Sequence, residues 1–170
     1  MKDNIFKEEI RFARSLLLII ACLYILFGII YKIIPASDPL GFRKRIIMAV
    51  IFLFFLLISF ISNKIKENIY EYTRVVSYLA IIHLIYLAYI DKFSVNYIFS
   101  LIIVIIVANL IFKADKRLNI YNTVIVILLS ISVYLTPEIR INRMVFLVSF
   151  IIILYLTYLV NSNRYNIEKN

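Results

Sequence analysis

The sequence predicts an all-α membrane protein with six transmembrane helices arranged as three antiparallel hairpins. Hydrophobic residues make up 64% of its 170 residues, and the mean hydropathy is +0.95. Soluble domains are nearer half apolar, and a chain of this length cannot bury so much apolar surface in one core. The apolar residues gather in six runs joined by short polar links. Lipid is therefore the solvent that this composition favours.

The six runs are each close to the length that a helix needs to cross a hydrocarbon core of roughly 30 Å. They do not alternate polar and apolar residues, as the strands of a membrane barrel would. Short links favour antiparallel neighbours, so the first and second, third and fourth, and fifth and sixth helices are expected to pair. The expected helices cover residues 15–34, 46–62, 75–90, 95–112, 118–135 and 144–160.

The distribution of Lys and Arg predicts the orientation. With the N-terminus inside, twelve of the nineteen Lys and Arg residues fall on the inner side, as the positive-inside rule requires. We expect a multi-pass protein of the cytoplasmic (inner) membrane, with both termini in the cytoplasm. Residues 1–14 would form a basic cytoplasmic leader, residues 15–160 the transmembrane domain and residues 161–170 a cytoplasmic tail.

The segment "IIPASDPLGFRKR", residues 33–45, holds three of the five prolines and glycines of the chain. Pro35 is expected to end the first helix because proline cannot donate into a helical ladder. Asp38 suits the N-cap of a second helix whose first residue is Pro39. The segment therefore predicts an ordered turn, which enters the second helix one turn before Arg43.

Two interpretations of Arg43 remain open. In the first, Arg43 faces the protein at the outer mouth of the bundle, where Asp91 and Glu138 are potential partners, while Lys44 and Arg45 lie on other faces. In the second, the segment is an ordinary loop whose basic residues contact lipid headgroups, and exposed ion pairs there are worth only about 0–1 kcal/mol.

The longer segment "YKIIPASDPLGFRKR" resembles the first outer loop of a six-helix membrane region. That region stands at the N-terminus of many bacterial sensor histidine kinases and of some PAS-containing or nucleotide-cyclase signalling proteins. The resembling features fall on Pro35, Asp38, Pro39 and Arg43. "DKFSVNY" resembles the following outer hairpin, and "KADKRLNIY" resembles the inner turn before the fifth helix. The resemblance implies a sensory or signal-input module, but no phosphoacceptor box or ATP-binding motif occurs in this chain.

Few polar residues interrupt the runs. His83, the single histidine, falls near the middle of the third run, where titratable groups are costly and often functional. Two roles are open for His83. It is a neutral packing residue, or it has a functional role as a proton-linked switch or as a ligand contact. Tyr78 and Tyr86, with Tyr89, either line a ligand pocket or pack in the bundle. Asn109 is expected to make a hydrogen bond between helices.

These residues indicate a signal-input module without a catalytic motif, so no enzyme activity, metal or cofactor is expected. The expected partners are the lipid bilayer, a cytoplasmic signalling domain or partner at the C-terminus, and a second copy of the chain. Nucleic acid is not expected, because the cations lie in short loops between apolar runs. A substrate-binding subunit of a small membrane transporter and an accessory protein of a larger membrane complex remain alternatives.

Overall fold

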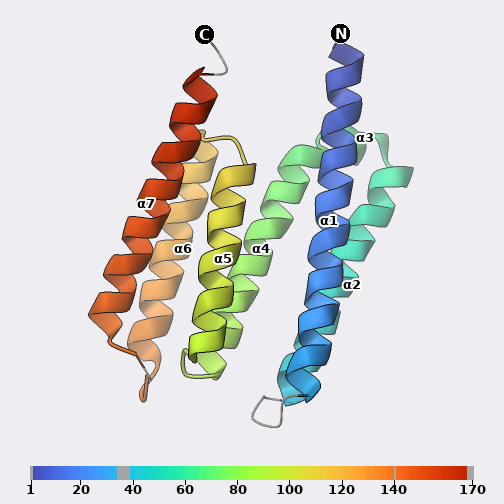
Figure 1. Cartoon of the computed structure of the whole chain (residues 1–170). Coiled ribbons are helices and arrows are strands. Elements are labelled where there is room, and N and C mark those ends of the chain that lie inside the picture. Colours follow the sequence, from blue (N-terminus) through green and yellow to red (C-terminus); the bar gives the residue numbers. More distant parts are fainter. Residues whose placement is uncertain (1, 34–38, 140, 168–170) are drawn as a thin grey trace. The chain divides into compact units, whose positions relative to one another are not determined.

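The structure is a computed structural model that describes residues 2–33, 39–139 and 141–167. Within these ranges the regular structure is entirely helical, with no strand. Figure 1 shows the helices in chain order. They are α1 (Lys2–Ile33), α2 (Pro39–Ile61), α3 (Asn63–Glu67), α4 (Ile69–Ile90), α5 (Val95–Ile111), α6 (Lys116–Leu135) and α7 (Arg143–Ile167). The predicted all-helical class is confirmed.

Five of the described helices are long and apolar enough to cross a membrane: α1, α2, α4, α6 and α7. The remaining apolar run forms α5, which has 17 residues. At about 1.5 Å per residue, α5 is roughly 26 Å long, a little short of a core of roughly 30 Å. The structure therefore does not confirm six spans, because the helix that the fourth predicted run forms is shorter than a membrane-spanning helix usually is.

Several helix boundaries differ from the expected ones, among them the starts of α1 and α4 and the end of α7. Helix α1 includes the basic leader and the first apolar run in one helix of 32 residues, since Lys, Glu and Arg are good helix formers that need no lipid contact. Helix α4 begins at Ile69, and the unpredicted helix α3 precedes it. Ser62 caps α3, because its hydroxyl oxygen accepts a hydrogen bond from the backbone N–H of Ile65 at 3.4 Å.

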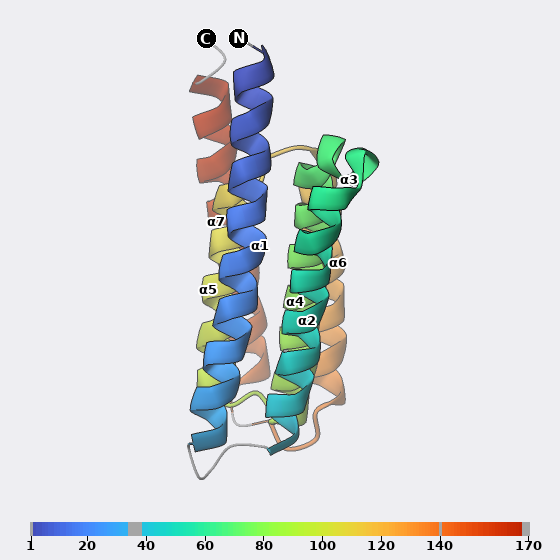
Figure 2. The ribbon, with the colours of Figure 1, turned by 90° about the vertical axis from the view of Figure 1, so that its right-hand side faces the viewer.

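The chain divides into two compact units, Met1–Val76 and Ser77–Asn170, with α4 continuing from the first to the second. In unit 1, α1 and α2 lie side by side in opposite directions (Figures 1 and 2). The ring of Tyr24 lies 5.5 Å from that of Phe52 between their centroids. A Cβ placed on Gly28 would lie 3.3 Å from the Phe42 ring, so the lack of a side chain at Gly28 permits this close approach.

In unit 2, α7 approaches both α5 and α6 closely. Figure 1 shows α5 and α7 running in the same direction, with α6 antiparallel to both. The α5–α7 packing joins two helices that are not consecutive in the chain, and the predicted arrangement of hairpins is not confirmed. The buried apolar side chains include Leu101, Ile105, Leu118, Ile125, Leu129 and Phe150.

A tight turn joins α4 to α5. Lys92 and Phe93 have φ values of 51° and 53°, in the left-handed region that side chains larger than glycine rarely adopt. The backbone N–H of Phe93 donates to the carbonyl oxygen of Ala88 at 2.7 Å. The buried ring of Phe93 packs on Phe146, with 5.9 Å between centroids. These contacts offset the backbone strain and fix the start of α5.

Candidate functional site

A chain of hydrogen bonds connects α4, α5 and α6 inside unit 2. The hydroxyl of Tyr78 donates to the side-chain oxygen of Asn122 at 2.9 Å. The side-chain Nδ2 of Asn122 donates in turn to Oδ1 of Asn109 at 2.7 Å. The Tyr78 ring also stacks on Tyr121, with 4.8 Å between centroids. Tyr78 and Asn109 are both buried, so this chain joins three helices where water does not compete for the bonds.

Asn161 extends the same cluster to α7. Its side-chain Nδ2 donates to the backbone carbonyl oxygens of Asn109 and of Phe112, the latter at 2.6 Å. Carbonyls in the last turn of a helix have no partner within that helix. Asn161 satisfies two of them and thereby holds α7 against the C-terminal end of α5. We refer to Tyr78, Asn109, Asn122 and Asn161 as the amide cluster.

Two polar atoms of the amide cluster remain unused. Nδ2 of Asn109 and Oδ1 of Asn161 are buried and have no hydrogen-bond partner among the residues that the structure describes. A buried polar group without a partner costs about 1–3 kcal/mol. The cluster therefore retains one unused donor group and one unused acceptor in a buried place.

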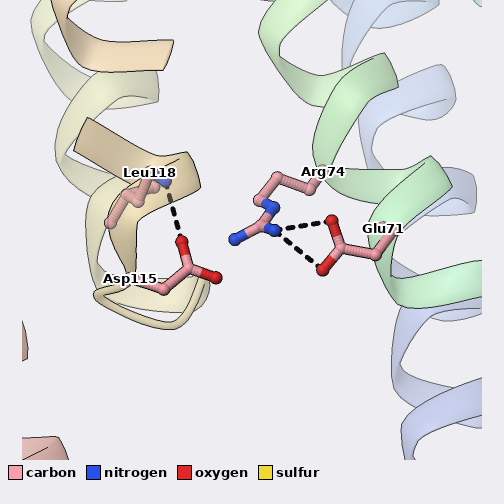
Figure 3. Close-up of polar contacts among 4 residues, drawn as sticks. All are labelled: Glu71, Arg74, Asp115 and Leu118. Atoms are coloured by element: carbon pink, nitrogen blue, oxygen red, sulfur yellow. Dashed lines mark hydrogen bonds and ion pairs between the residues drawn. The ribbon is translucent and has the colours of Figure 1, made fainter. Parts of the chain in front are cut away.

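Local structure at the start of α6 positions Asn122. Asp115 is the N-cap of α6, and its Oδ1 accepts a hydrogen bond from the backbone N–H of Leu118 at 2.8 Å (Figure 3). With α6 fixed at this residue, Asn119 and Asn122 lie one turn apart. Asn119 donates to the hydroxyl of Tyr158 on α7 at 3.1 Å. The same helix thus contacts α7 through one asparagine and α5 through the other.

The structure brings the predicted membrane residues together in two pairs, Tyr78 with Asn109 and His83 with Tyr86. Tyr78 and Asn109 meet through Asn122, and the expected interhelical hydrogen bond of Asn109 is present. His83 is half-buried, and its ring centroid lies 6.4 Å from that of Tyr86. Tyr86 is 48% exposed, whereas Tyr78 is 3% exposed. Tyr78 and Tyr86 thus differ in burial, and a ligand pocket lined by the tyrosines of this helix stays a prediction.

The N-terminal end of α2 differs from its expected orientation. Pro35 and Asp38 lie outside the described residues, and α2 begins at Pro39. Arg43 is exposed, while Arg45 is only 3% exposed. Two residues correspond to about 200° around a helix, so the two arginines point to nearly opposite sides. The face of α2 that packs on α1 carries Arg45, so Arg43 lies on the side of α2 away from α1, and its pairing with Asp91 or Glu138 stays a prediction.

Glu138 has another partner than the one expected. Its carboxylate pairs with the ammonium of Lys92 at 2.5 Å, which connects the α4–α5 turn to the segment between α6 and α7. The hydrogen bond from Lys92, followed by the charge of Lys92, lowers the pKa of Glu138 below its ordinary value. This ion pair is exposed, so it contributes little to the stability of the fold.

Sequence reasoning missed Asn122 and Asn161. Asn122 interrupts the fifth apolar run in the same way that Asn109 interrupts the fourth, and that similarity was a usable signal. Asn161 was placed in the tail beyond the sixth run, whereas α7 continues to Ile167. In unit 1, Arg74 was also missed. It is fully buried, and its guanidinium makes two hydrogen bonds to Glu71, at 2.7 and 2.5 Å (Figure 3).

The chemistry of the amide cluster is restricted to hydrogen bonding, since its three amides and one phenol carry no charge at neutral pH. In the described part of the chain, no three His, Cys, Asp or Glu side chains are grouped so that they could hold a metal ion. Comparison of the chain with protein-family models, with curated proteins and with solved structures found no match.

Proposed function

We propose that this protein is a multi-pass membrane signal-input module in which α7 transmits the response. The supporting observation is that Asn161 holds α7 through two carbonyls at the end of α5. The proposal includes six membrane passes with both termini in the cytoplasm, in agreement with the Lys and Arg distribution. Helix α5 would be the shortest pass, accommodated by local thinning of the bilayer.

The amide cluster supplies an element with more than one arrangement. Hydrogen bonds between membrane helices are worth about 0.6–1.7 kcal/mol each, so exchanging one for another requires little free energy. The unused Nδ2 of Asn109 and Oδ1 of Asn161 are groups that a second arrangement would satisfy. A stimulus shifts such an equilibrium by its differential affinity for the two arrangements. Release of the α5 carbonyls by Asn161 would then allow the end of α7 to move.

The proposal is tested by removing the Asn161 contacts. Asn161→Leu keeps the volume of the side chain roughly constant and abolishes both hydrogen bonds. Asn163→Leu is the matched control, because Asn163 is exposed on the same helix. In the native host lacking the original gene, Asn161→Leu should change the phosphorylation of a signalling protein or the level of a cyclic nucleotide severalfold. Asn163→Leu should behave as the wild type.

A distance measurement shows whether α7 has moved. Spin labels on cysteines introduced at Leu110 and Val160, both exposed, report the α5–α7 distance once Cys22 is replaced by Ser. We expect Asn161→Leu to broaden or displace this distance distribution, with no change in Asn163→Leu. A displaced helix without any change of signalling, or a change of solute uptake in its place, would reject the signal-input function.

A further inference from the structure

A basic hollow lies in unit 1, at the end formed by the N-terminal part of α1 and by α3. Its volume is about 400 Å³, within the size range of small-ligand sites, and its lining residues are Lys7, Ile10, Arg11, Arg14, Ser15 and Lys66. Four of the six carry a positive charge, and none carries a negative one. The hollow is separate from the amide cluster, which belongs to unit 2.

The helical repeat of α1 concentrates the positive charge on one side. Residues 7, 11 and 14 fall within about 60° of one another around a helix with 3.6 residues per turn. Glu8 and Glu9 lie about 100° and 200° away from Lys7 by the same measure. Lys66 completes the hollow from α3. Glu9 therefore points away from the hollow, and no residue that lines the hollow carries a negative charge.

One cation of the hollow is held in place and the others are available. The guanidinium of Arg14 donates to the hydroxyl and to the backbone carbonyl of Ser59, at 3.1 and 2.5 Å, and lies 3.8 Å from the centre of the Phe60 ring. Among the side chains that the structure describes, which in α1 begin at Lys7, no ion pair or side-chain hydrogen bond involves Lys7, Arg11 or Lys66. Three cations with unused donors around a hollow are suited to the oxygens of a phosphate group.

The same side of α1 becomes apolar directly beyond the hollow. Leu18, one turn after Arg14, is 47% exposed, and Cys22, one turn further, is also exposed. The hollow thus lies where the charged part of α1 meets the apolar run that begins at residue 15. A ligand with a phosphate in the hollow would have space for an acyl chain along Leu18 and Cys22.

We propose that the hollow binds the phosphate of an anionic membrane lipid through Lys7, Arg11 and Lys66, with the acyl chains along α1. A soluble phosphate ester shares the recognised group but gains nothing from the exposed apolar side of the helix. The geometry therefore favours the lipid as the source of the phosphate. Arg14 acts as a positioning residue, since its contacts with Ser59 fix the wall of the hollow.

The test uses the full chain in detergent micelles and compares binding of phosphatidylglycerol with that of phosphatidylcholine by native mass spectrometry. The variant Lys7→Gln/Arg11→Gln should lose affinity for phosphatidylglycerol on the order of tenfold, because each cation near an anionic lipid contributes to attraction. The control Lys32→Gln/Arg43→Gln removes two exposed charges, one at the C-terminal end of α1 and one near the start of α2, and should change affinity less than about twofold.

Two results would overturn the proposal. Equal losses of affinity for phosphatidylglycerol in the two double variants would mean that binding depends on net charge alone and that the hollow is not a binding site. Displacement of phosphatidylglycerol by millimolar inorganic phosphate would assign the hollow to a soluble phosphate. Persistence of the lipid in the presence of inorganic phosphate, together with selective loss in Lys7→Gln/Arg11→Gln, is the supporting result. Both variants must keep the wild-type melting temperature.

Discussion

The two units of the chain use different polar groups in their interiors. Unit 1 buries the arginines Arg45 and Arg74 and fixes Arg14 on a serine of α2. Unit 2 buries the neutral amides Asn109 and Asn161. A charge at the centre of a bilayer costs about 2.5–3.5 kcal/mol even on the lower scales, and the arginines lie near the apolar boundary or in the first two turns of their helices.

The difference separates a rigid region from an adjustable one. Removing one partner of a buried ion pair costs about 3–5 kcal/mol, so the contact between Arg74 and Glu71 in unit 1 rarely exchanges. A hydrogen bond between membrane helices is worth only about 0.6–1.7 kcal/mol, so the amide contacts of unit 2 exchange readily. Unit 1 is thus suited to anchoring and unit 2 to rearrangement, and the following variants measure that contrast.

The largest effect is expected at Arg74. Arg74→Gln removes a fully buried guanidinium and leaves Glu71, whose side chain is 36% exposed, without this partner. We expect the free energy of unfolding to fall by about 3 kcal/mol, the lower end for a buried pair because Glu71 is partly hydrated. Reversible unfolding in mixed micelles measures this change in the free energy of unfolding. The variant Glu71→Gln should cost at least as much, because it removes the carboxylate that pairs with the fully buried guanidinium of Arg74. A clearly smaller loss there would contradict the importance of this pair.

The second effect distinguishes Arg45 from Arg43. Arg45→Gln should reduce the free energy of unfolding by about 1–3 kcal/mol, the cost of leaving buried groups unsatisfied. Arg43→Gln, on the exposed side of the same helix, should change it by less than about 0.5 kcal/mol. Melting of both proteins in the same lipid compares them directly. A larger loss for Arg43→Gln would support the interpretation in which Arg43 faces the protein.

The smallest effect concerns the amide cluster. A double-mutant cycle of Asn109→Ala and Asn122→Ala should give a coupling free energy of about 0.6–1.7 kcal/mol, as for other hydrogen bonds between membrane helices. Asn109→Ala combined with Ser100→Ala is the control, since Ser100 bonds within its own helix and should be additive. Coupling near that of a buried ion pair would remove the contrast between the units.

Much of the fold, and part of the site, followed from residue patterns. The apolar runs identified the long helices because lipid requires every backbone group to bond within its own segment. The interhelical bond of Asn109 was predictable, since an amide within an apolar run needs a partner. The orientation of Arg43 was not predictable from the sequence, because it depends on which side of α2 packs on Gly28 and Tyr24 of α1. A uniformly apolar helix carries no periodicity that selects this side.

The continuity of α1 gives the protein a rigid rod. Its 32 residues measure about 48 Å at 1.5 Å per residue, whereas the hydrocarbon core is roughly 30 Å thick. If its apolar part crosses the bilayer, about 18 Å of the same rod stands in the headgroup layer and the water beyond it. If the part of α1 inside the bilayer tilts, the protruding end moves sideways with it, because a continuous helix turns as one body. A change in bilayer thickness that alters the tilt of α1 would therefore displace its N-terminal end at the membrane surface.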